Sequence, residues 1–424
     1  MQNPTAQTTV EAARLHAQHQ RPLYNTYGFS QIPQTVLHAL TGAGHAGLPV
    51  DVWGELPRRW DKLIVILIDA FGWHQIERYA EQYAFLRRFF DKGVVSQLTT
   101  QFPSTTTAHI TTMYTGLPVG QHGLYEWFTY EPVLGRVVIP LLSAETEHDA
   151  PRNGLLKSGI KPQQLYPLPS FSQSLVDRGA TSVVLMPREF LTSAYNDTLC
   201  QGAKIIPRIT LSQGLRTMAD LVTQIKGPAS FYFYLSEIDT LAHRFGPASR
   251  EVDAEVDTLF TALERLLYTP LAGRTDTAII LTADHGQVRT NPDGLTMLDA
   301  DLPQLHRMIK LASDGRPIAP AGSPRDVFLH LKPEAIDDAY GLLNDSVGAE
   351  GIAEVYRTRD LIEQGYFGEV GPRFIERVGD VAALALDDHV LWFGDGRDIP
   401  HYFGMHGGLH PDEMLTHFSV MPLA

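Results

Sequence analysis

The sequence contains a single cysteine, Cys200, among 424 residues. A disulfide framework or a thiolate metal cluster needs several cysteines, so the sequence excludes both. No apolar stretch approaches the roughly 18 residues that a transmembrane helix needs, and we therefore expect no membrane partner. The N-terminal segment lacks a charged region followed by an apolar core, so we expect no signal peptide and a cytoplasmic location.

Positive charge is also scarce, because 34 Lys and Arg residues face 48 Asp and Glu residues, which gives a net charge of −14. A nucleic-acid backbone requires a basic surface, so no nucleic-acid polymer is expected as a partner. A small phosphate ester is still compatible with this charge, since bound metal ions reverse the local field. The 44% hydrophobic content is typical of a globular chain with one large core or two domains.

Apolar runs alternate with helical patterns along most of the chain. We predict strands at 62–69, 93–100, 180–186, 229–235 and 276–284. Helical periodicity is found at 74–90, 106–116, 212–227 and 249–267. This alternation predicts an α/β fold with a doubly wound, mostly parallel sheet between layers of helices.

Composition also divides the chain into segments. Residues 1–58 are polar with scattered Pro and Gly, which suggests an N-terminal arm whose short helices pack on the main body. Residues 59–295 and 401–424 form the predicted catalytic core. Between them, residues 296–400 change character and predict an α+β subdomain inserted as a cap on the main fold.

Acidic residues follow three of the predicted core strands. Asp69 and Asp284 end two strands, and Asp239 follows a third after a short connection. The carboxyl ends of parallel strands meet at one edge of a sheet, so these acids should gather there with His285. His243 lies four residues after Asp239, on the same face of a helical turn. A helix-capping Asp–His pair would give the same local pattern, but three such strand endings predict a metal site.

Two further segments carry candidate groups. The segment QFPSTTTAHITTMYTG (101–116) places three threonines where a strand leads into a helix. A helix N-terminus binds phosphoryl groups, although a threonine there also serves as an ordinary N-cap. Beside a dinuclear metal site, a metal-bound threonine hydroxyl becomes a nucleophile. Near the end of the chain, His406 precedes Gly407-Gly408, which either points it inward or forms a flexible tail loop.

These residues belong to five ordered motifs that resemble the alkaline phosphatase superfamily, and within it the type I phosphodiesterase/nucleotide pyrophosphatase family. Phosphonoacetate hydrolases are close neighbours in this branch. The resemblance covers about residues 60–290 and 400–420. The motifs are LIVILIDAFG (63–72), FPSTTTAHITTMYTGLPVGQHG (102–123), EIDTLAHRFGP (237–247), TADHG (282–286) and HGGL (406–409).

The resemblance implies two divalent metal sites at the active centre. The ligands would be Asp239, His243 and His406 in one site, and Asp69, Asp284 and His285 in the other, with the nucleophile as a further ligand of the second. Mixed His and Asp ligands favour Zn²⁺, with Mn²⁺ as the alternative.

The family pattern also implies the nucleophile. It lies ten residues before the Gly of the Thr-Gly turn and three after a proline. Counting back from Gly116 gives Thr106, with Pro103 three residues earlier, and Thr105 is the alternative.

Substrate contacts are expected from Thr107, Tyr125 and Trp127. Nucleotide pyrophosphatases have an asparagine at the place of Trp127, where it helps to hold the phosphoryl oxygens. This departure puts a preference for nucleotides in doubt.

The implied activity is metal-dependent phosphoryl transfer, in which phosphodiester or pyrophosphate bonds of small phosphate esters are hydrolysed through a phosphothreonine intermediate. A phosphomonoesterase or phosphonate hydrolase of the same superfamily is the alternative, and a non-catalytic metal-binding protein is a remote one. A sulfatase is disfavoured, because its nucleophile lies in a Cys-x-Pro-x-Arg context and Cys200 lies in TLCQGAK. The sequence carries no signal for an oligomeric state.

Overall fold

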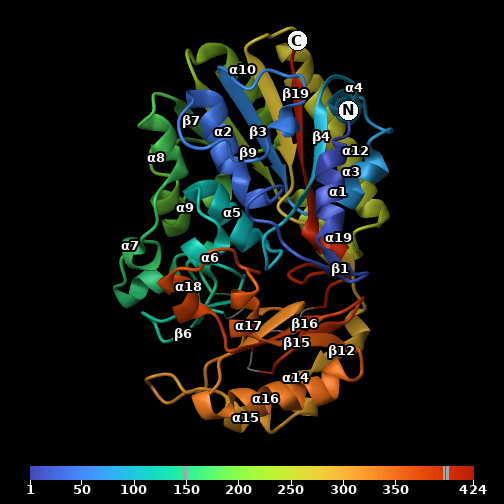
Figure 1. Ribbon diagram of the computed structural model, residues 1–424. Coiled ribbons are helices and arrows are strands. Elements are labelled where there is room, and N and C mark those ends of the chain that lie inside the picture. The colour runs from blue at the N-terminus through green and yellow to red at the C-terminus, as the bar shows by residue number, and fades with distance from the viewer. Residues whose placement is uncertain (147–149, 395–396, 398–400) are drawn as a thin grey trace.

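The computed structural model describes residues 1–146, 150–394, 397 and 401–424. Its larger unit is built on a seven-stranded sheet (Figure 1). The strand order is β4 (Val94–Thr99), β19 (Leu415–Pro422), β10 (Thr277–Thr282), β3 (Lys62–Ile68), β9 (Ala229–Leu235), β7 (Thr181–Pro187) and β8 (Lys204–Arg208). Only β19 runs antiparallel to its neighbours, so the predicted mostly parallel α/β sheet is confirmed.

Helices cover both faces of this sheet, which explains why its central strands are apolar on both sides. All residues of β3 are buried. One face carries α2 (Ile32–Thr41), α5 (Thr106–Thr115) and α8 (Phe171–Val176). The other carries α3 (Trp73–Tyr79), α4 (Ala84–Lys92), α10 (Leu211–Gln224) and α12 (Arg250–Ala262) (Figure 1). In the part of the chain that the structure describes, no helix combines the length and apolarity needed to span a membrane.

The smaller unit is an antiparallel sheet of β13 (Ala321–Ser323), β14 (Asp326–Leu329), β16 (Val381–Ala385) and β15 (Ala353–Arg357). Side chains alternate between its two faces. Val327 and Leu329 pack with α14 (Leu298–Asp301), α15 (Leu305–Met308) and α16 (Ile336–Leu343). Phe328 instead packs with Phe102 and Tyr125 of the larger unit. The sheet therefore lies between its own helices and the larger unit.

Three features of the fold differ from the sequence prediction. The predicted helix 74–90 is two helices, α3 and α4. Strands β8 and β19 were not predicted, since β8 is a partly exposed edge strand and β19 carries Thr416 and His417 among its apolar residues. The expected end of the insert, at residue 400, lies outside the described residues.

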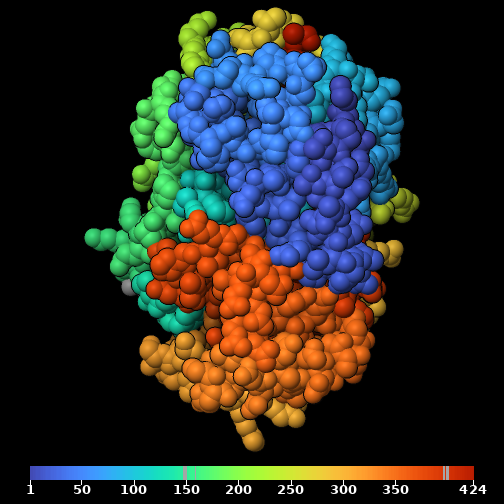
Figure 2. Space-filling view, viewed as in Figure 1, coloured from blue at the N-terminus to red at the C-terminus, as the bar shows by residue number. Residues whose placement is uncertain are grey.

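The N-terminal segment is more closely integrated than an arm. Helix α2 buries Ile32, Val36 and Leu40 in the main core. The hairpin of β1 (Arg14–His16) and β2 (His19–Gln20) reaches the smaller unit, where the Nδ1 atom of His19 lies 2.7 Å from a carboxylate oxygen of Glu354. Figure 2 shows this segment, in blue, on the surface of the larger unit and against the smaller one.

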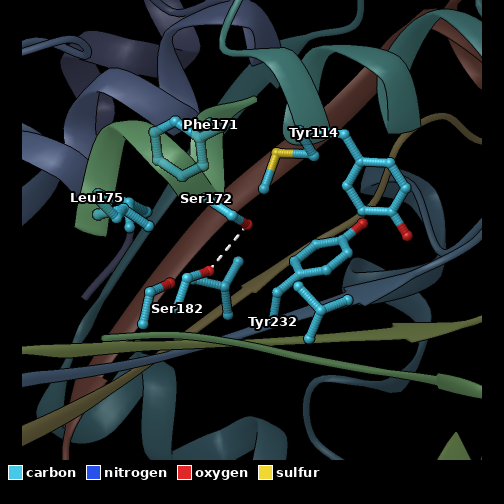
Figure 3. A pocket seen from close by; sticks show the side chains of 11 residues that line it. Tyr114, Phe171, Ser172, Leu175, Ser182 and Tyr232 are labelled. Carbon is cyan, nitrogen blue, oxygen red and sulfur yellow. Dashed lines mark hydrogen bonds between the residues drawn. The ribbon is translucent and has the colours of Figure 1, made fainter. Parts of the chain in front are cut away.

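A small cavity lies inside the larger unit, between the sheet and helices α5 and α8 (Figure 3). Its volume is about 20 Å³, and its lining includes Tyr114, Phe171 and Tyr232. This volume accommodates about one water molecule. The cavity is therefore too small to hold a substrate.

A buried ion pair joins the two units. Arg325 of the smaller unit and Glu413 of α19 (Pro411–Met414) are both fully buried. The Nε and Nη2 atoms of Arg325 donate to the two Glu413 oxygens at 3.2 and 3.1 Å. Glu413 also accepts the backbone N–H of Gly408 at 3.0 Å. The pair thus links the smaller unit to the loop that carries His406.

We expect Arg325→Met to lower the free energy of unfolding by about 3–5 kcal/mol, because the Glu413 carboxylate would remain buried without its partner. Chemical denaturation measures this loss. The control is Arg316→Met, whose pair with Asp314 is exposed and should matter little. Equal losses in both variants would contradict a special role for the buried pair.

Candidate active site

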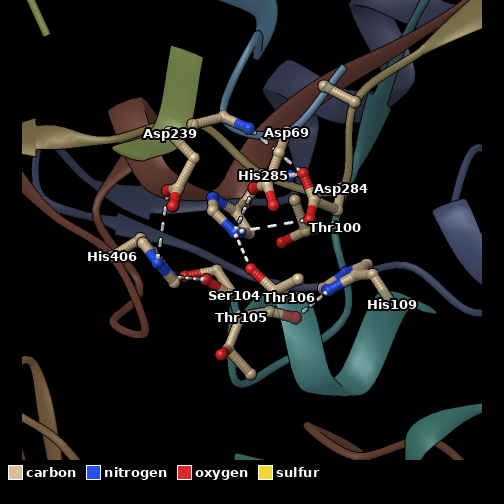
Figure 4. Close-up of polar contacts among 12 residues, drawn as sticks. Asp69, Thr100, Ser104, Thr105, Thr106, His109, Asp239, Asp284, His285 and His406 are labelled. Carbon is tan, nitrogen blue, oxygen red and sulfur yellow. Dashed lines mark hydrogen bonds and ion pairs between the residues drawn. The ribbon is translucent and has the colours of Figure 1, made fainter. Parts of the chain in front are cut away.

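The carboxyl ends of β3, β9 and β10 place the predicted acids at one edge of the sheet, facing the smaller unit (Figures 1 and 4). Asp69 follows β3 directly, and Asp284 and His285 follow β10. Asp239 lies in the first turn of α11 (Glu237–Phe245), which begins two residues after β9, and His243 lies one turn later. The structure therefore brings the five residues together as the sequence predicts.

His406 reaches the same edge from a loop near the end of the chain. Gly407 follows it with a φ of 127°, and a Cβ atom there would lie 2.5 Å from the Ser323 hydroxyl oxygen. Only glycine fits this close approach. The Ser104 hydroxyl donates to the Gly408 carbonyl at 2.8 Å and accepts the Gly407 N–H at 3.1 Å. Ser104, which the sequence did not single out, thus fixes the His406 loop to the segment that leads into α5.

All three histidines use Nδ1 to bond a backbone carbonyl. The partners are Gly404 for His243 at 2.7 Å, Gly286 for His285 at 3.0 Å and Ser104 for His406 at 2.9 Å. A carbonyl only accepts, so each Nδ1 carries a proton, and in the neutral ring Nε2 then presents a lone pair. This tautomer is the one in which a histidine binds a metal ion through Nε2.

The spacing of these groups fits ions placed between them. Nε2 of His285 lies 3.4 Å from Asp69 Oδ1 and 3.5 Å from Asp284 Oδ2. Oδ1 of Asp239 lies 3.3 Å from Nε2 of His243 and 3.7 Å from Nε2 of His406. Tetrahedral ligands bound at about 2.0–2.1 Å are about 3.3 Å apart. Both Asp69 Oδ1 and Asp284 Oδ2 are buried and have no hydrogen-bond partner among the described residues. Ligand atoms of Asp69, Asp284 and His285 lie within 4.8 Å of one another, as do those of Asp239, His285 and His406, so these donors fit divalent ions.

The buried carboxylates of the site also favour the binding of cations. Burial raises the pKa of Asp69 well above its usual range, and the charges of Asp284 and Asp239 raise it further. Burial likewise raises the pKa of Asp284. For Asp239 burial acts in the same direction, but the charge of His243 and its hydrogen bond, together with the charges of His406 and His285, outweigh burial and lower the pKa. Burial lowers the pKa of His406, which keeps this ligand neutral. Bound cations would allow all three carboxylates to remain ionised.

A third His and acid cluster lies away from this edge and has different spacing. His16 Nε2 and His19 Nδ1 lie 2.8 and 2.7 Å from the two oxygens of Glu354. These separations are those of charge-assisted hydrogen bonds and are too short for two ligands of one ion. This cluster therefore ties the N-terminal hairpin to the smaller unit.

The threonines differ in where their hydroxyls lie. Thr106 is the first residue of α5, and its Oγ1 lies 3.1 Å from Nε2 of His285 (Figure 4). Thr106 is partly exposed, whereas Thr105 and Thr107 are buried. The Thr107 hydroxyl has no hydrogen-bond partner among the described residues. The first N–H groups of α5 are free to bind an anion next to Thr106. This arrangement favours Thr106 over Thr105 as the nucleophile.

The predicted substrate contact of Tyr125 is wrong. Its ring is fully buried, with centroid distances of 5.3 Å to Phe328 and 5.6 Å to Phe374, so it fills the core between the two units. The side chain of Trp127 is 36% exposed, and its contact with substrate stays a prediction.

The sequence analysis assigned no role to Glu126. It is fully buried, and one of its carboxylate oxygens accepts the backbone N–H of Trp127, while the other has no hydrogen-bond partner among the described residues. Burial raises the pKa of its carboxyl to about 8. The only sequence signal for this buried acid was its place between two aromatic residues after His122-Gly123. Burial of an acid depends on residues that lie far away in the chain, so the local sequence does not predict it.

The comparisons with known proteins agree with this geometry. Residues 63–409 match the family model described as type I phosphodiesterase / nucleotide pyrophosphatase. A comparison with curated protein sequences gives no match.

Two of the similar solved structures illustrate the fold. The murine ectonucleotide pyrophosphatase/phosphodiesterase 5 is 18% identical with a TM-score of 0.58, over 84% of this chain and 87% of that chain. The phosphonoacetate hydrolase from Sinorhizobium meliloti 1021, solved with phosphonoacetate, is 16% identical with a TM-score of 0.60, over 86% and 91%. With more than half of its length matched by the family model, the chain belongs to the type I phosphodiesterase/nucleotide pyrophosphatase family of enzymes, in the alkaline phosphatase superfamily.

Proposed function

We propose that the protein is a metal-dependent hydrolase of small phosphodiesters or pyrophosphates that forms a phosphothreonine at Thr106. One observation carries this proposal. The Thr106 hydroxyl lies at the start of α5 and 3.1 Å from the His285 nitrogen that also faces Asp69 and Asp284. A hydroxyl beside a set of metal ligands and a helix N-terminus has the surroundings of a phosphoryl-transfer nucleophile.

Asp69, Asp284, His285 and Thr106 would hold one divalent ion, and Asp239, His243 and His406 the other. When bound, such ions lower the pKa of hydroxyl and water oxygens and neutralise charge that develops on phosphoryl oxygens. The donor types favour Zn²⁺, with Mn²⁺ as the alternative.

The residues of the chain supply the remaining steps. Thr106 Oγ1 releases its proton to solvent and attacks phosphorus, and the bond from phosphorus to the leaving oxygen breaks. The N–H groups at the start of α5 orient the phosphoryl oxygens. A water molecule then attacks the phosphothreonine, which restores the Thr106 hydroxyl and releases the phosphate product.

A second candidate is phosphonate hydrolysis. It is favoured by the structural likeness to the phosphonoacetate hydrolase and by Trp127 at the place of the nucleotide pyrophosphatase asparagine. The same Thr106 hydroxyl would then lose its proton to solvent and attack the phosphorus of a phosphonate. The phosphorus–carbon bond would break with its electron pair going to carbon, which takes a proton from water, and a second water molecule would hydrolyse the phosphothreonine.

Hydrolysis of three compounds separates these candidates. With added Zn²⁺ or Mn²⁺, we expect the protein to hydrolyse bis-p-nitrophenyl phosphate with a kcat/KM at least about tenfold higher than for p-nitrophenyl phosphate. Phosphonoacetate should be a poor substrate. Release of nitrophenol and of inorganic phosphate measures all three rates. A preference for p-nitrophenyl phosphate would assign a monoesterase, and a preference for phosphonoacetate would assign a phosphonate hydrolase.

A further inference from the structure

Exposed aromatic side chains are few. Among the Phe, Tyr and Trp residues that the structure describes, only four are more than a third exposed: Trp127, Phe245, Tyr402 and Phe403. The other exposed large apolar residues are aliphatic and lie on separate segments. Phe245 lies two residues after His243, and Tyr402 and Phe403 precede His406 in the chain. Apolar surface that gathers in one place usually marks a binding site.

Tyr402 is in direct contact with a candidate metal ligand. Its ring centroid lies 5.0 Å from that of His243, and the side chain is still 43% exposed. The Tyr402 carbonyl accepts the Thr290 hydroxyl at 2.8 Å, and the next N–H, of Phe403, donates to the His243 carbonyl at 2.8 Å. These two bonds hold the peptide group that follows Tyr402, so the ring stays packed on His243 while 43% of the residue remains exposed.

The position of Tyr402 relative to the proposed nucleophile indicates which part of the substrate it would contact. The Thr106 hydroxyl contacts His285, whereas Tyr402 adjoins His243 of the other ligand set, with Asp239 and His406. In phosphoryl transfer the attacking and leaving oxygens lie roughly in line on opposite sides of phosphorus. The leaving oxygen therefore departs on the side of Asp239, His243 and His406. The group attached to that oxygen emerges beside Tyr402.

We propose that Tyr402 forms a subsite for the leaving group, and that the substrates of this enzyme carry a flat aromatic group on the leaving oxygen. This inference rests on the proposed function, because it takes Thr106 as the nucleophile. A flat ring stacks on an exposed tyrosine, whereas a small alkyl group covers little of it. Stacking of one ring on an aromatic side chain changes affinity by about tenfold.

The test compares two diesters that differ only in the leaving group, methyl 4-nitrophenyl phosphate and methyl 2,2,2-trifluoroethyl phosphate. Each substrate is compared with itself in wild-type and variant protein, so the intrinsic reactivity of the leaving groups cancels. We expect Tyr402→Ala to lower kcat/KM about tenfold for the aryl ester and at most about twofold for the alkyl ester, mainly through KM. Tyr402→Phe should retain the preference, since the ring remains. Phosphorus NMR follows both reactions.

Two control variants locate the effect. Ile375→Ala removes an exposed apolar side chain of the smaller unit and should leave both reactions unchanged. Trp127→Ala should change kcat/KM by the same factor for both esters, because the methyl group that both retain on phosphorus is the same. Equal losses for both esters in Tyr402→Ala would overturn the proposal and show that the ring only supports His243.

A binding measurement keeps the inference separate from the proposed function. If the wild-type protein hydrolyses neither diester, the proposed function fails, and the subsite is judged by calorimetry with Zn²⁺-loaded protein. Phenylphosphonate should then bind about tenfold more tightly than methylphosphonate, and Tyr402→Ala should abolish the difference. Equal affinities in the wild-type protein would overturn the subsite.

Discussion

Thr106→Ala is expected to lower kcat for a phosphodiester by about 1,000-fold or more, because water would have to attack phosphorus without the covalent step. Its Oγ1 is the threonine hydroxyl that contacts His285, at 3.1 Å. The other ligands remain, so thermal unfolding and metal content should stay close to those of the wild-type protein. Steady-state kinetics, elemental analysis and calorimetry measure the three quantities.

Two matched variants test the assignment. Thr106→Ser should retain substantial activity, because a serine hydroxyl reaches the same place. Thr105→Ala should be mild, since Thr105 is buried at the N-cap of α5 and the hydroxyl that contacts His285 belongs to Thr106. If the wild-type protein reacts with a phosphodiester labelled at phosphorus and is then quenched with acid, the label should be found on the peptide that contains Thr106. Loss of activity in Thr105→Ala with a fully active Thr106→Ala would move the nucleophile by one residue.

The sequence predicts the ligand positions well because each follows a strong local signal. Asp69, Asp239 and Asp284 come at or soon after apolar strands whose parallel arrangement can be inferred from alternating elements. His243 then follows from helical spacing. The fold and the clustering of these residues agree with the prediction, because strand ends converge in any parallel sheet, whatever the rest of the chain does.

Residues whose role depends on distant packing could not be predicted in this way. Tyr125 follows the motif closely in sequence, yet Phe328 and Phe374 from the smaller unit enclose its ring. Strand β19 escaped prediction because His417, fully buried in the sheet, interrupts its apolar pattern. Neighbouring groups satisfy only one of its ring nitrogens, because Nδ1 bonds the Ser419 hydroxyl at 2.9 Å and the buried Nε2 has no hydrogen-bond partner among the described residues.

Removal of divalent ions is expected to lower activity by about 1,000-fold or more and also to lower the melting temperature. The three carboxylates of the site lie within a buried cluster, and two of their oxygens have no hydrogen-bond partner among the described residues. Ions that bind only the folded state stabilise it by about 2.7 kcal/mol at a concentration 100 times their Kd. Chelation followed by calorimetry and kinetic assay measures both effects, and re-addition of Zn²⁺ or Mn²⁺ should reverse them.

Asp69→Asn distinguishes a metal site from a buried cluster of carboxylates that is stabilised by bound protons. Without ions, this variant should melt at a higher temperature than the wild-type protein at pH 7. The raised pKa of Asp69 means that the folded wild-type protein must either bury a charge facing Asp284 and Asp239 or take up a proton, and asparagine avoids both costs. With ions, the order should reverse, because the variant loses a charged ligand. Asp314→Asn, at an exposed acid paired with Arg316, should melt close to the wild-type temperature in both conditions. If ions leave the melting temperature of the wild-type protein unchanged, the three carboxylates do not form a metal site, and their mutual repulsion must be relieved by bound protons.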